Sequence, residues 1–352
     1  MSHPFTIDSA YLQETLLGLL NTPSPSGMTE EAIQLCIKHF EALDLSCERT
    51  RRGALRAKWE GKDPQLPARG IIAHVDTLGA QVKALKDNGR LAVTMIGHWS
   101  ARFAEGARCT IHTDTQTYRG TLLPLKASGH TFNTEIDTQP SNWQNLEIRI
   151  DADVFNKADL EKAGFNVGDF VSVDAAPDVV NGYINARHLD DKAGVASMLA
   201  AVKALKDAGQ QPQANTYFMV SVYEEVGAGA PAILPEEVGS LVSIDNGTTA
   251  PGQNSAEFGV TIAMGDMTGP FDAPLTQKLI GLCKTYKIAH QRDVFRFYKS
   301  DNSTALAAGH DIQAALITFG IDASHGWERI HMNALESVAQ LTAQYVCSGG
   351  DL

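Results

Sequence analysis

Side chains that commonly bind metal ions follow several largely apolar runs of this 352-residue chain. The runs cover residues 71–73, 218–222, 241–244 and 316–319. The acids and histidines that come next are His74, Asp76, Glu224, Glu225, Asp245 and His325. In an open α/β sheet the ligand crevice lies beyond the carboxyl ends of the strands, so we expect these groups to converge on one place.

His74 and Asp76 are separated by a single residue. On an extended strand they would lie on the same face, where the carboxylate can accept the second ring proton of the imidazole and fix its tautomer. A lone His-x-Asp pair is weak evidence, because most such pairs are ordinary surface or core pairs. Asp190 and Asp191 open an Ala-rich helical stretch, where an aspartate N-cap and a favourable interaction with the helix dipole are the simpler explanation.

The adjacent carboxylates Glu224 and Glu225 are harder to explain without a ligand. After such an apolar run, burial would cost them several kcal/mol unless they were paired, protonated or bound to metal. Their side chains point in different directions, so one glutamate can bind a metal ion while the other holds a water molecule. Asp245 precedes Asn246 and Gly247 and could instead be a turn former.

Two late histidines leave an ambiguity, because spacing does not decide whether His325 or His331 is the metal ligand. The segment 300–304 could contact a substrate, but we favour a helix cap. The sequence has no Gly-x-Ser-x-Gly elbow and no cysteine in a nucleophile setting. Covalent acyl transfer therefore lacks its usual signatures.

Composition excludes several other classes of protein. The formal net charge of −12, without a long Lys/Arg cluster, argues against nucleic acid and against anionic membrane surfaces. The 43% of hydrophobic residues is typical of a globular protein. No signal segment or membrane span is apparent, and five scattered cysteines fit a reducing compartment. We therefore expect a cytoplasmic protein.

Hydrophobic periodicity predicts an α/β fold that is interrupted once. Helical periodicity over about 8–45 is broken at residues 21–27, where Ser26 or Thr29 could cap the helix that restarts. Short alternating runs predict a mostly β insertion between about 82 and 172. Elsewhere strands and helices alternate: the predicted strands are 68–78, 216–223, 241–245 and 313–319, and the predicted helices are 191–208, 273–287 and 333–347.

This alternation predicts a mixed sheet covered by helices on both faces. We expect a discontinuous catalytic domain formed by residues 1–81 and 173–352. An inserted β-rich domain would span residues 82–172.

The order of the motifs resembles the glutamyl and tetrahedral aminopeptidase family of dinuclear metallopeptidases. His-x-Asp at residues 74–76 is followed by Leu-Asp-Asp-Lys-x-Gly at 189–194 and by Glu-Glu-Val-Gly at 224–227. Asp245 and a late Ser-His at 324–325 complete the order. The resemblance covers nearly the whole chain, including residues 21–27, which are similar to that family's amino-terminal signature.

The resemblance implies two divalent metal ions per subunit. Carried over residue by residue, it makes Asp190 the carboxylate that bridges both ions. His74 and Asp245 would complete one site, and Glu225 and His325 the other. Mixed nitrogen and oxygen ligands suit zinc first, with cobalt and manganese as alternatives.

The resemblance also implies a mechanism and an assembly. Glu224 would be the general base acting on a bridging hydroxide, and Asp76 would stand behind His74. The peptide bond between Asp190 and Asp191 would be cis. The β insertion would correspond to the family's dimerisation domain, so we expect a homo-oligomer between a dimer and a dodecamer.

Two departures from the family pattern bear on the substrate. Thr77 stands where an acidic residue is usual after His-x-Asp, and the late motif reads Ser-His-Gly-Trp-Glu-Arg at 324–329. Segments 99–106 and 128–133 resemble a subgroup associated with N-acetylglutaminylglutamine amide, an osmolyte. We predict an aminopeptidase acting on a small peptide-like substrate. The alternatives are an amidase or deacylase acting on an N-acetylated dipeptide, and a binding protein that has kept the fold.

Overall fold

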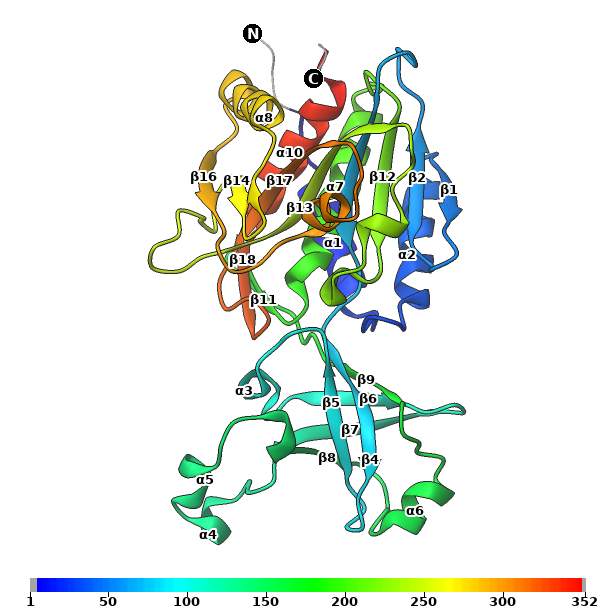
Figure 1. Ribbon diagram of the computed structural model, residues 1–352, viewed down its shortest axis with the longest axis vertical. Helices are drawn as coiled ribbons and strands as arrows, with labels where there is room; N and C mark the ends of the chain where they lie inside the picture. Colours follow the sequence, from blue (N-terminus) through cyan, green and yellow to red (C-terminus); the bar gives the residue numbers. More distant parts are fainter. Residues whose placement is uncertain (1–4, 350–352) are drawn as a thin grey trace.

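The computed structural model describes residues 5–349 and places a mixed sheet at the centre of the larger part of the molecule (Figure 1). The order along the sheet is β1-β2-β12-β3-β13-β17-β14-β15, and β16 also pairs with β14. The strands are β1 (Ser46–Arg49), β2 (Leu55–Trp59), β3 (Ala68–His74), β12 (Thr216–Ser221), β13 (Val238–Thr248), β14 (Val260–Asp266), β15 (Gly269–Pro270), β16 (His290–Val294) and β17 (Gln313–Ile321).

The four central strands β12, β3, β13 and β17 run parallel to one another. All residues of β3 and β12 are buried, as expected for strands covered on both faces. In the register of the sheet, His74 lies opposite Ser221, and Asp245 lies opposite Thr318. Parallel strands end at a common edge, so this register brings the ends of the chemically important segments together.

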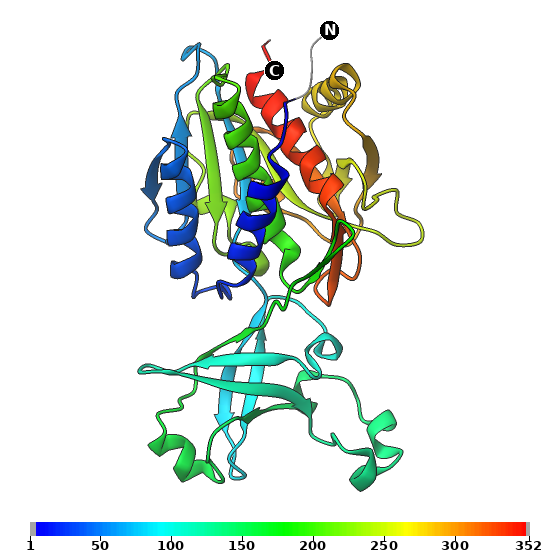
Figure 2. The same ribbon diagram turned by 180° about the vertical axis from the view of Figure 1, so that it is seen from behind.

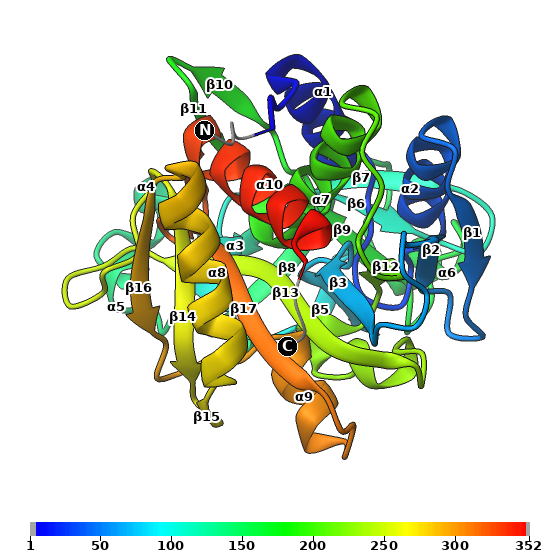
Figure 3. The same cartoon turned by 90° about the horizontal axis from the view of Figure 1, so that it is seen from above.

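Helices cover both faces of the sheet, as predicted. Helices α1, α2, α7 and α10 lie on one face and α9 lies on the other, while α8 packs on β14 and β17 (Figures 2 and 3). The helices are α1 (Ser9–Leu20), α2 (Glu30–Ala42), α7 (Leu189–Asp207), α8 (Ala273–Tyr286), α9 (Asp301–Ala307) and α10 (Met332–Cys347). None of the helices within residues 5–349 is long and apolar enough to cross a membrane.

A closed barrel lies below the sheet in Figure 1, with the strand order β4-β5-β8-β7-β6-β9. Its strands are β4 (Gly79–Leu85), β5 (Leu91–Ile96), β6 (Arg108–His112), β7 (Thr117–Pro124), β8 (Leu146–Ile150) and β9 (Phe170–Val173). Short helices lie in the segments that connect its strands: α3 (Ala101–Ala104), α4 (Gly129–Phe132), α5 (Glu135–Thr138), η1 (Trp143–Asn145) and α6 (Lys157–Lys162). The barrel packs around its own apolar cluster, separate from the core of the sheet and its helices.

The predicted helices agree with α7, α8 and α10 to within two residues. Sequence periodicity missed β14 and β16, which form one side of the sheet: β16 is mostly polar, whereas the largely apolar run 260–264 of β14 was a signal that the prediction did not use. It also missed a small sheet of β10 (Asp178–Val180), β11 (Tyr183–Ala186) and β18 (Glu328–His331). This small sheet ties the segment before α7 to the segment after His325.

Candidate metal centre

His74 is the last residue of β3, and its side chain is only 2% exposed. Its Nδ1 lies 2.9 Å from the backbone carbonyl of Asp76. Because a carbonyl oxygen only accepts, Nδ1 carries a proton, and Nε2 is the ring nitrogen that faces the neighbouring carboxylates. The predicted partner, the Asp76 carboxylate, is 3.6 Å from Nδ1, so it is the Asp76 backbone that orients the ring.

The Asp76 carboxylate has a different set of partners. It accepts hydrogen bonds from the Ser26 hydroxyl at 2.5 Å and from the backbone amides of Glu224 and Glu225 at 3.1 and 3.3 Å. Asp76 is fully buried, and burial raises its pKa. Ser26 therefore does not cap α2, and Thr29 occupies the N-cap position without a side-chain bond. Through its bonds to the two amides, the Asp76 carboxylate fixes the turn that carries Glu224 and Glu225.

Asp190 lies between two histidines, near the start of α7. Its Oδ1 is 3.2 Å from Nε2 of His74, and its Oδ2 is 3.3 Å from Nε2 of His325. Although burial raises it, contacts with both histidines hold the pKa of Asp190 below its ordinary value. The peptide bond between Asp190 and Asp191 is cis, as the sequence resemblance implied.

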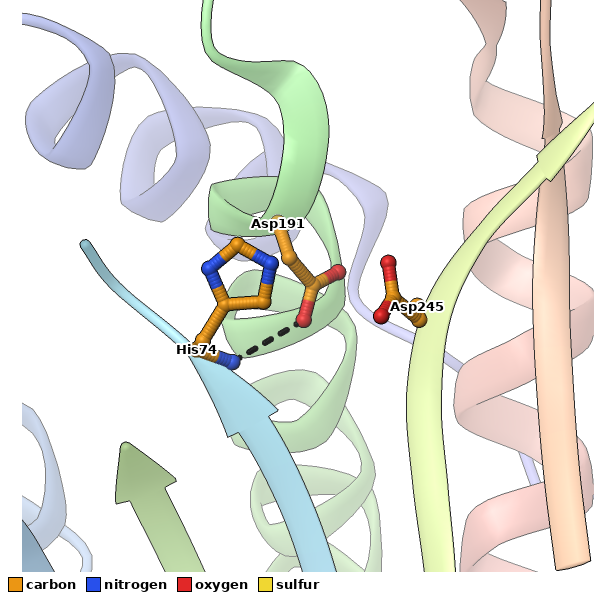
Figure 4. Close-up of side chains that lie close together, drawn as sticks. All are labelled: His74, Asp191 and Asp245. Atoms are coloured by element: carbon orange, nitrogen blue, oxygen red, sulfur yellow. Dashed lines mark hydrogen bonds between the residues drawn. The ribbon is translucent and has the colours of Figure 1, made fainter. Parts of the chain in front are cut away.

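The candidate ligands form two groups whose atoms lie within 4.8 Å of one another. One group is Asp190, Glu225 and His325, with 3.7 Å between Nε2 of His325 and Oε2 of Glu225. The other group joins His74 and Asp245 to Asp191 (Figure 4). Asp191 was not among the predicted ligands. The two groups meet at His74 and Asp190.

Asp191 also anchors the end of β3. Its Oδ2 accepts a hydrogen bond from the backbone amide of His74 at 3.0 Å (Figure 4), while its buried Oδ1 has no partner. A Cβ added at Gly194 would lie 2.1 Å from that Oδ1. The glycine of the Leu-Asp-Asp-Lys-x-Gly motif is therefore required to make room for the second aspartate.

Glu224 and Glu225 stand in a single 3-10 turn, η2 (Glu224–Val226), that follows β12. Oε2 of Glu224 lies 3.8 Å from Nε2 of His74. Burial raises the pKa of Glu224 well above its ordinary value, and it raises the pKa of Glu225 to about 8. The two side chains diverge toward different histidines, as their adjacency predicted.

His325 lies on a loop and adopts a left-handed backbone conformation with φ of 63°. Its Nδ1 bonds to the backbone carbonyl of His98, at 2.9 Å, in the segment between β5 and α3. Burial lowers the pKa of His325, but the neighbouring Asp190 and Glu225 raise it overall, to about 10. The competing histidine, His331, caps α10 through the Asn333 amide and is not a member of either group.

Glu328 is a buried carboxylate that the sequence analysis did not single out. Its Oε1 accepts from the backbone amide of His325 at 2.8 Å, and its Oε2 accepts from the amides of Leu189 and Asp190 at 2.8 and 3.2 Å. Burial raises its pKa to about 8. One side chain thus fixes the backbone of two predicted ligands. Its signal in the sequence was an acid two residues before Ile330, on the same face of a short strand whose other face is more exposed.

Asp245 is held by Ser300 and Asn246, for which the sequence suggested a helix cap and a turn. The Ser300 hydroxyl donates to Oδ2 of Asp245 at 2.5 Å. Ser300 stands before α9, but its side chain makes no capping bond, so the preferred helix-cap role was wrong for this residue. Asn246 donates to Oδ2 of Asp190 at 2.6 Å and to Asp245 at 3.1 Å. Burial and the nearby charge of Asp190 raise the pKa of Asp245 to about 7.

A cavity of about 710 Å³ opens onto these groups, and we call it the inner cavity. Asp190, Glu224, Glu225, Asp245 and His325 all line it. Its outer wall carries large apolar side chains, including Phe297 and Met267, which are 90% and 56% exposed. Clustered carboxylates and imidazoles at the ends of parallel strands, beside a substrate-sized cavity, define the class of a metal-dependent hydrolase.

Comparison with known proteins narrows this class. The M42 glutamyl aminopeptidase family matches residues 53–341. The protein YhfE of Bacillus subtilis (strain 168), whose name marks it as a candidate aminopeptidase, is 36% identical over 337 residues, which are 95% of this chain and 97% of YhfE. FrvX of Escherichia coli (strain K12), similarly named, is 25% identical over 77% of this chain and 76% of its own length.

Solved structures agree with the fold. A TET aminopeptidase from the marine sediment archaeon Thaumarchaeota archaeon SCGC AB-539-E09 superposes with a TM-score of 0.86 at 18% identity over 96% of each chain. The TET1 peptidase of Pyrococcus horikoshii gives a TM-score of 0.84 at 21% identity, over 95% of this chain and 99% of its own. The chain belongs to the M42 glutamyl aminopeptidase family and is a metallopeptidase.

Proposed function

We propose that this metallopeptidase uses two divalent ions to remove the amino-terminal residue from small peptides. Asp190 would bridge the ions, with His74 and Asp245 on one side and Glu225 and His325 on the other. Glu224 would be the general base. The observation that carries the proposal is the placement of Asp190, whose two oxygens face the Nε2 atoms of two different histidines at 3.2 and 3.3 Å.

The donor groups fit such ions. Oε1 of Glu225 is buried without a hydrogen-bond partner, and a cation would relieve this. The raised pKa values of Glu225 and Asp245, about 8 and 7, reflect buried carboxylates crowded together, which bound cations would compensate. Mixed oxygen and nitrogen donors favour zinc, cobalt or manganese over magnesium or calcium.

The protein's own groups would perform the proton chemistry. Bound divalent ions would supply Lewis-acid polarisation of the scissile carbonyl and lower the pKa of water. Glu224 lines the cavity and its side chain is 13% exposed, so its carboxylate can accept a proton from water and return it to the leaving nitrogen. Asp76 holds the Glu224 amide and thereby keeps this carboxylate at the cavity wall.

The acids of the inner cavity bear on whether the substrate has a free or an acylated amino group. Among the described residues that line the inner cavity, the acids are Asp190, Glu224, Glu225 and Asp245, and each already has a role in the proposed centre. A substrate ammonium group would have to share one of them. An amidase or deacylase acting on an N-acetylated dipeptide therefore remains the second candidate.

A metal titration with two substrate series tests the proposal. Chelator-treated protein would be titrated with zinc, cobalt or manganese while hydrolysis of aminoacyl anilides and of N-acetylated dipeptides is followed. We expect activity on the anilides to return and to saturate at two ions per chain. Saturation at one ion would overturn the two-metal proposal, and cleavage of the acetylated series alone would favour the second candidate.

We also propose that the chain assembles into a homo-oligomer through the barrel. The Pyrococcus horikoshii TET1 peptidase, similar in fold, can form a tetrahedron or a large octahedral shell. Sedimentation analysis of the intact protein would test this, and a monomer at micromolar concentration would contradict it.

A further inference from the structure

A second cavity, of about 670 Å³, lies between the barrel and the sheet domain, and we call it the junction cavity. The barrel contributes residues at the end of β5 and on β9, and the sheet domain contributes the turn after β12. The side chains that shape it are Thr94, Met95, Ile96, Phe170, Tyr223 and Val226. None of these residues has a role in the proposed metal centre.

The junction cavity adjoins the inner cavity. His98 and Glu225 line both of them. The backbone at Gly97 packs against Glu225, because a Cβ added there would lie 3.6 Å from the Cβ of Glu225 and 2.5 Å from Leu78. Tyr223 and Val226 flank the two glutamates directly in sequence. A molecule bound at the metal centre could therefore extend past Glu225 into this second space.

The chemistry of the junction cavity is largely neutral and partly apolar. Glu225, the proposed metal ligand, is the one charged side chain among its described lining residues. Met95 is 38% exposed and Val226 is 50% exposed, so apolar surface is available there to a ligand. A bound apolar side chain would remove this surface from water, whereas a carboxylate would find no Lys or Arg among the described lining residues.

The two cavities share Glu225 and His98, whereas Glu224 lines the inner cavity alone. The inner cavity continues past Asp245 toward Met267 and Phe297, and the junction cavity lies beside Tyr223 and Val226. Glu224, the group that would protonate the leaving nitrogen, is next in the chain to Glu225, which lines both cavities. The junction cavity is therefore the adjoining space into which the part of a substrate beyond that nitrogen can extend.

We propose that the junction cavity binds the side chain of the residue that follows the scissile bond, and that it selects apolar side chains. This inference rests on the proposed aminopeptidase function and adds a substrate class to it: peptides with an apolar second residue. The barrel would then contribute directly to specificity through Met95.

The test compares three substrates that share the amino-terminal residue X that is cleaved fastest. They are X-NH2, whose leaving group is ammonia and fills no cavity, X-Leu-NH2 and X-Asp-NH2. For the unmodified metal-loaded protein we expect kcat/KM to be at least about tenfold higher for X-Leu-NH2 than for X-Asp-NH2, equivalent to about 1.4 kcal/mol. Equal values for the two dipeptide amides would overturn the proposal.

Two variants at Met95 sharpen the test. Met95→Asp should lower kcat/KM for X-Leu-NH2 about tenfold, and Met95→Lys should raise it for X-Asp-NH2 by a similar factor, both with X-NH2 unchanged. Phe155→Asp is the matched control, because Phe155 is 74% exposed on the barrel and does not line the cavity. Equal loss on all three substrates in both Met95 variants would overturn the proposal. No metal-dependent cleavage of any substrate by the unmodified protein would instead refute the proposed function.

Discussion

The two histidines of the candidate metal centre are held in place in different ways. His74 ends a central strand, is 2% exposed, and is oriented by a carbonyl only two residues away in the chain. His325 is 30% exposed, lies on a loop with a left-handed backbone, and is oriented by the carbonyl of His98, 227 residues away and next to the barrel. The sheet domain thus completes one half of the centre by itself, while the other half depends on the insertion.

This difference indicates where the centre is rigid and where it can be tuned. The His74 half is built into the ends of β3 and β13, whose positions are set by the packing of the whole sheet. The His325 half depends on a few contacts, chiefly those made by the distant His98 carbonyl and by Glu328, three residues further along the chain. Changes to the barrel should therefore alter the position of His325 before that of the other proposed ligands.

The largest expected effect comes from the residue that both halves share. Asp190→Asn should prevent both ions from binding and lower kcat/KM by at least about 10³-fold, because the neutral amide offers each ion a weaker donor. Metal content by atomic spectroscopy and hydrolysis rates would be measured together. Asp191→Asn is the matched comparison: it should affect the His74 half alone, and loss of both ions in this variant would make Asp191 the bridging residue.

Loss of the proposed base should separate chemistry from metal binding. Glu224→Gln should retain both ions and lower kcat by about 10²- to 10⁴-fold, since the amide cannot accept the proton. In contrast, Glu225→Gln should reduce the metal content of the His325 half. If Glu224→Gln loses metal and Glu225→Gln does not, the two roles are exchanged.

Removing each late histidine tests the weaker half directly. His325→Ala should lose one of the two ions and keep the one on the His74 side. His331→Ala should keep both, because it removes the cap of α10 and two ring contacts but no proposed ligand. Stoichiometry would be measured after dialysis against limiting zinc. Full occupancy in His325→Ala would show that this histidine is not a ligand.

A smaller effect is expected from the carboxylate that supports His325. Glu328→Gln places an amide where backbone N–H groups now donate, so the affinity of the His325 half for metal should fall about 10- to 100-fold. Glu257→Gln is the control, because Glu257 pairs with Arg329 near the same loop without contacting a proposed ligand. A competitive chelator titration that gives equal affinities for the two variants would remove Glu328 from this role.

The pH dependence should be the mildest test. In the metal-free protein the pKa values of Asp245, Glu225 and His325 are raised to about 7, 8 and 10, so ions must displace protons. Affinity should rise with pH between 6 and 8, and binding at pH 7 should release protons, mainly from His74, Glu225 and His325. Calorimetry in buffers of different ionisation enthalpy would measure this release.

The raised pKa of Glu225 also determines whether the stability of the metal-free protein rises or falls with pH. Folded Glu225 keeps a proton, up to a pKa of about 8, that the unfolded chain releases near its ordinary value. The metal-free protein should therefore lose stability as pH rises from about 5 to 8. A thermal unfolding midpoint that increases with pH over this range would contradict the assignment.

The fold class could be read from the sequence because its signals are local. The apolar runs before His74 and Asp245 are continuous, as fully buried parallel strands require, and the Ala-rich segment after Asp191 has helical character. Strand β16 could not be recognised in this way, since its residues are mostly polar and it is placed by pairing with β14, whereas β14 has a largely apolar run that the prediction did not use. The division into domains, the metal, and a cytoplasmic location stay predictions.

The sequence by itself determined which residue types reach the carboxyl edge of the sheet, since strand ends and spacing are properties of the local chain. Only the tertiary structure decided what each of these groups contacts. Periodicity could not reveal that Asp76 serves the glutamate turn or that the His98 carbonyl orients His325. The physical reason is that such hydrogen bonds join segments tens to hundreds of residues apart, and their partners are often backbone groups that every residue type carries equally.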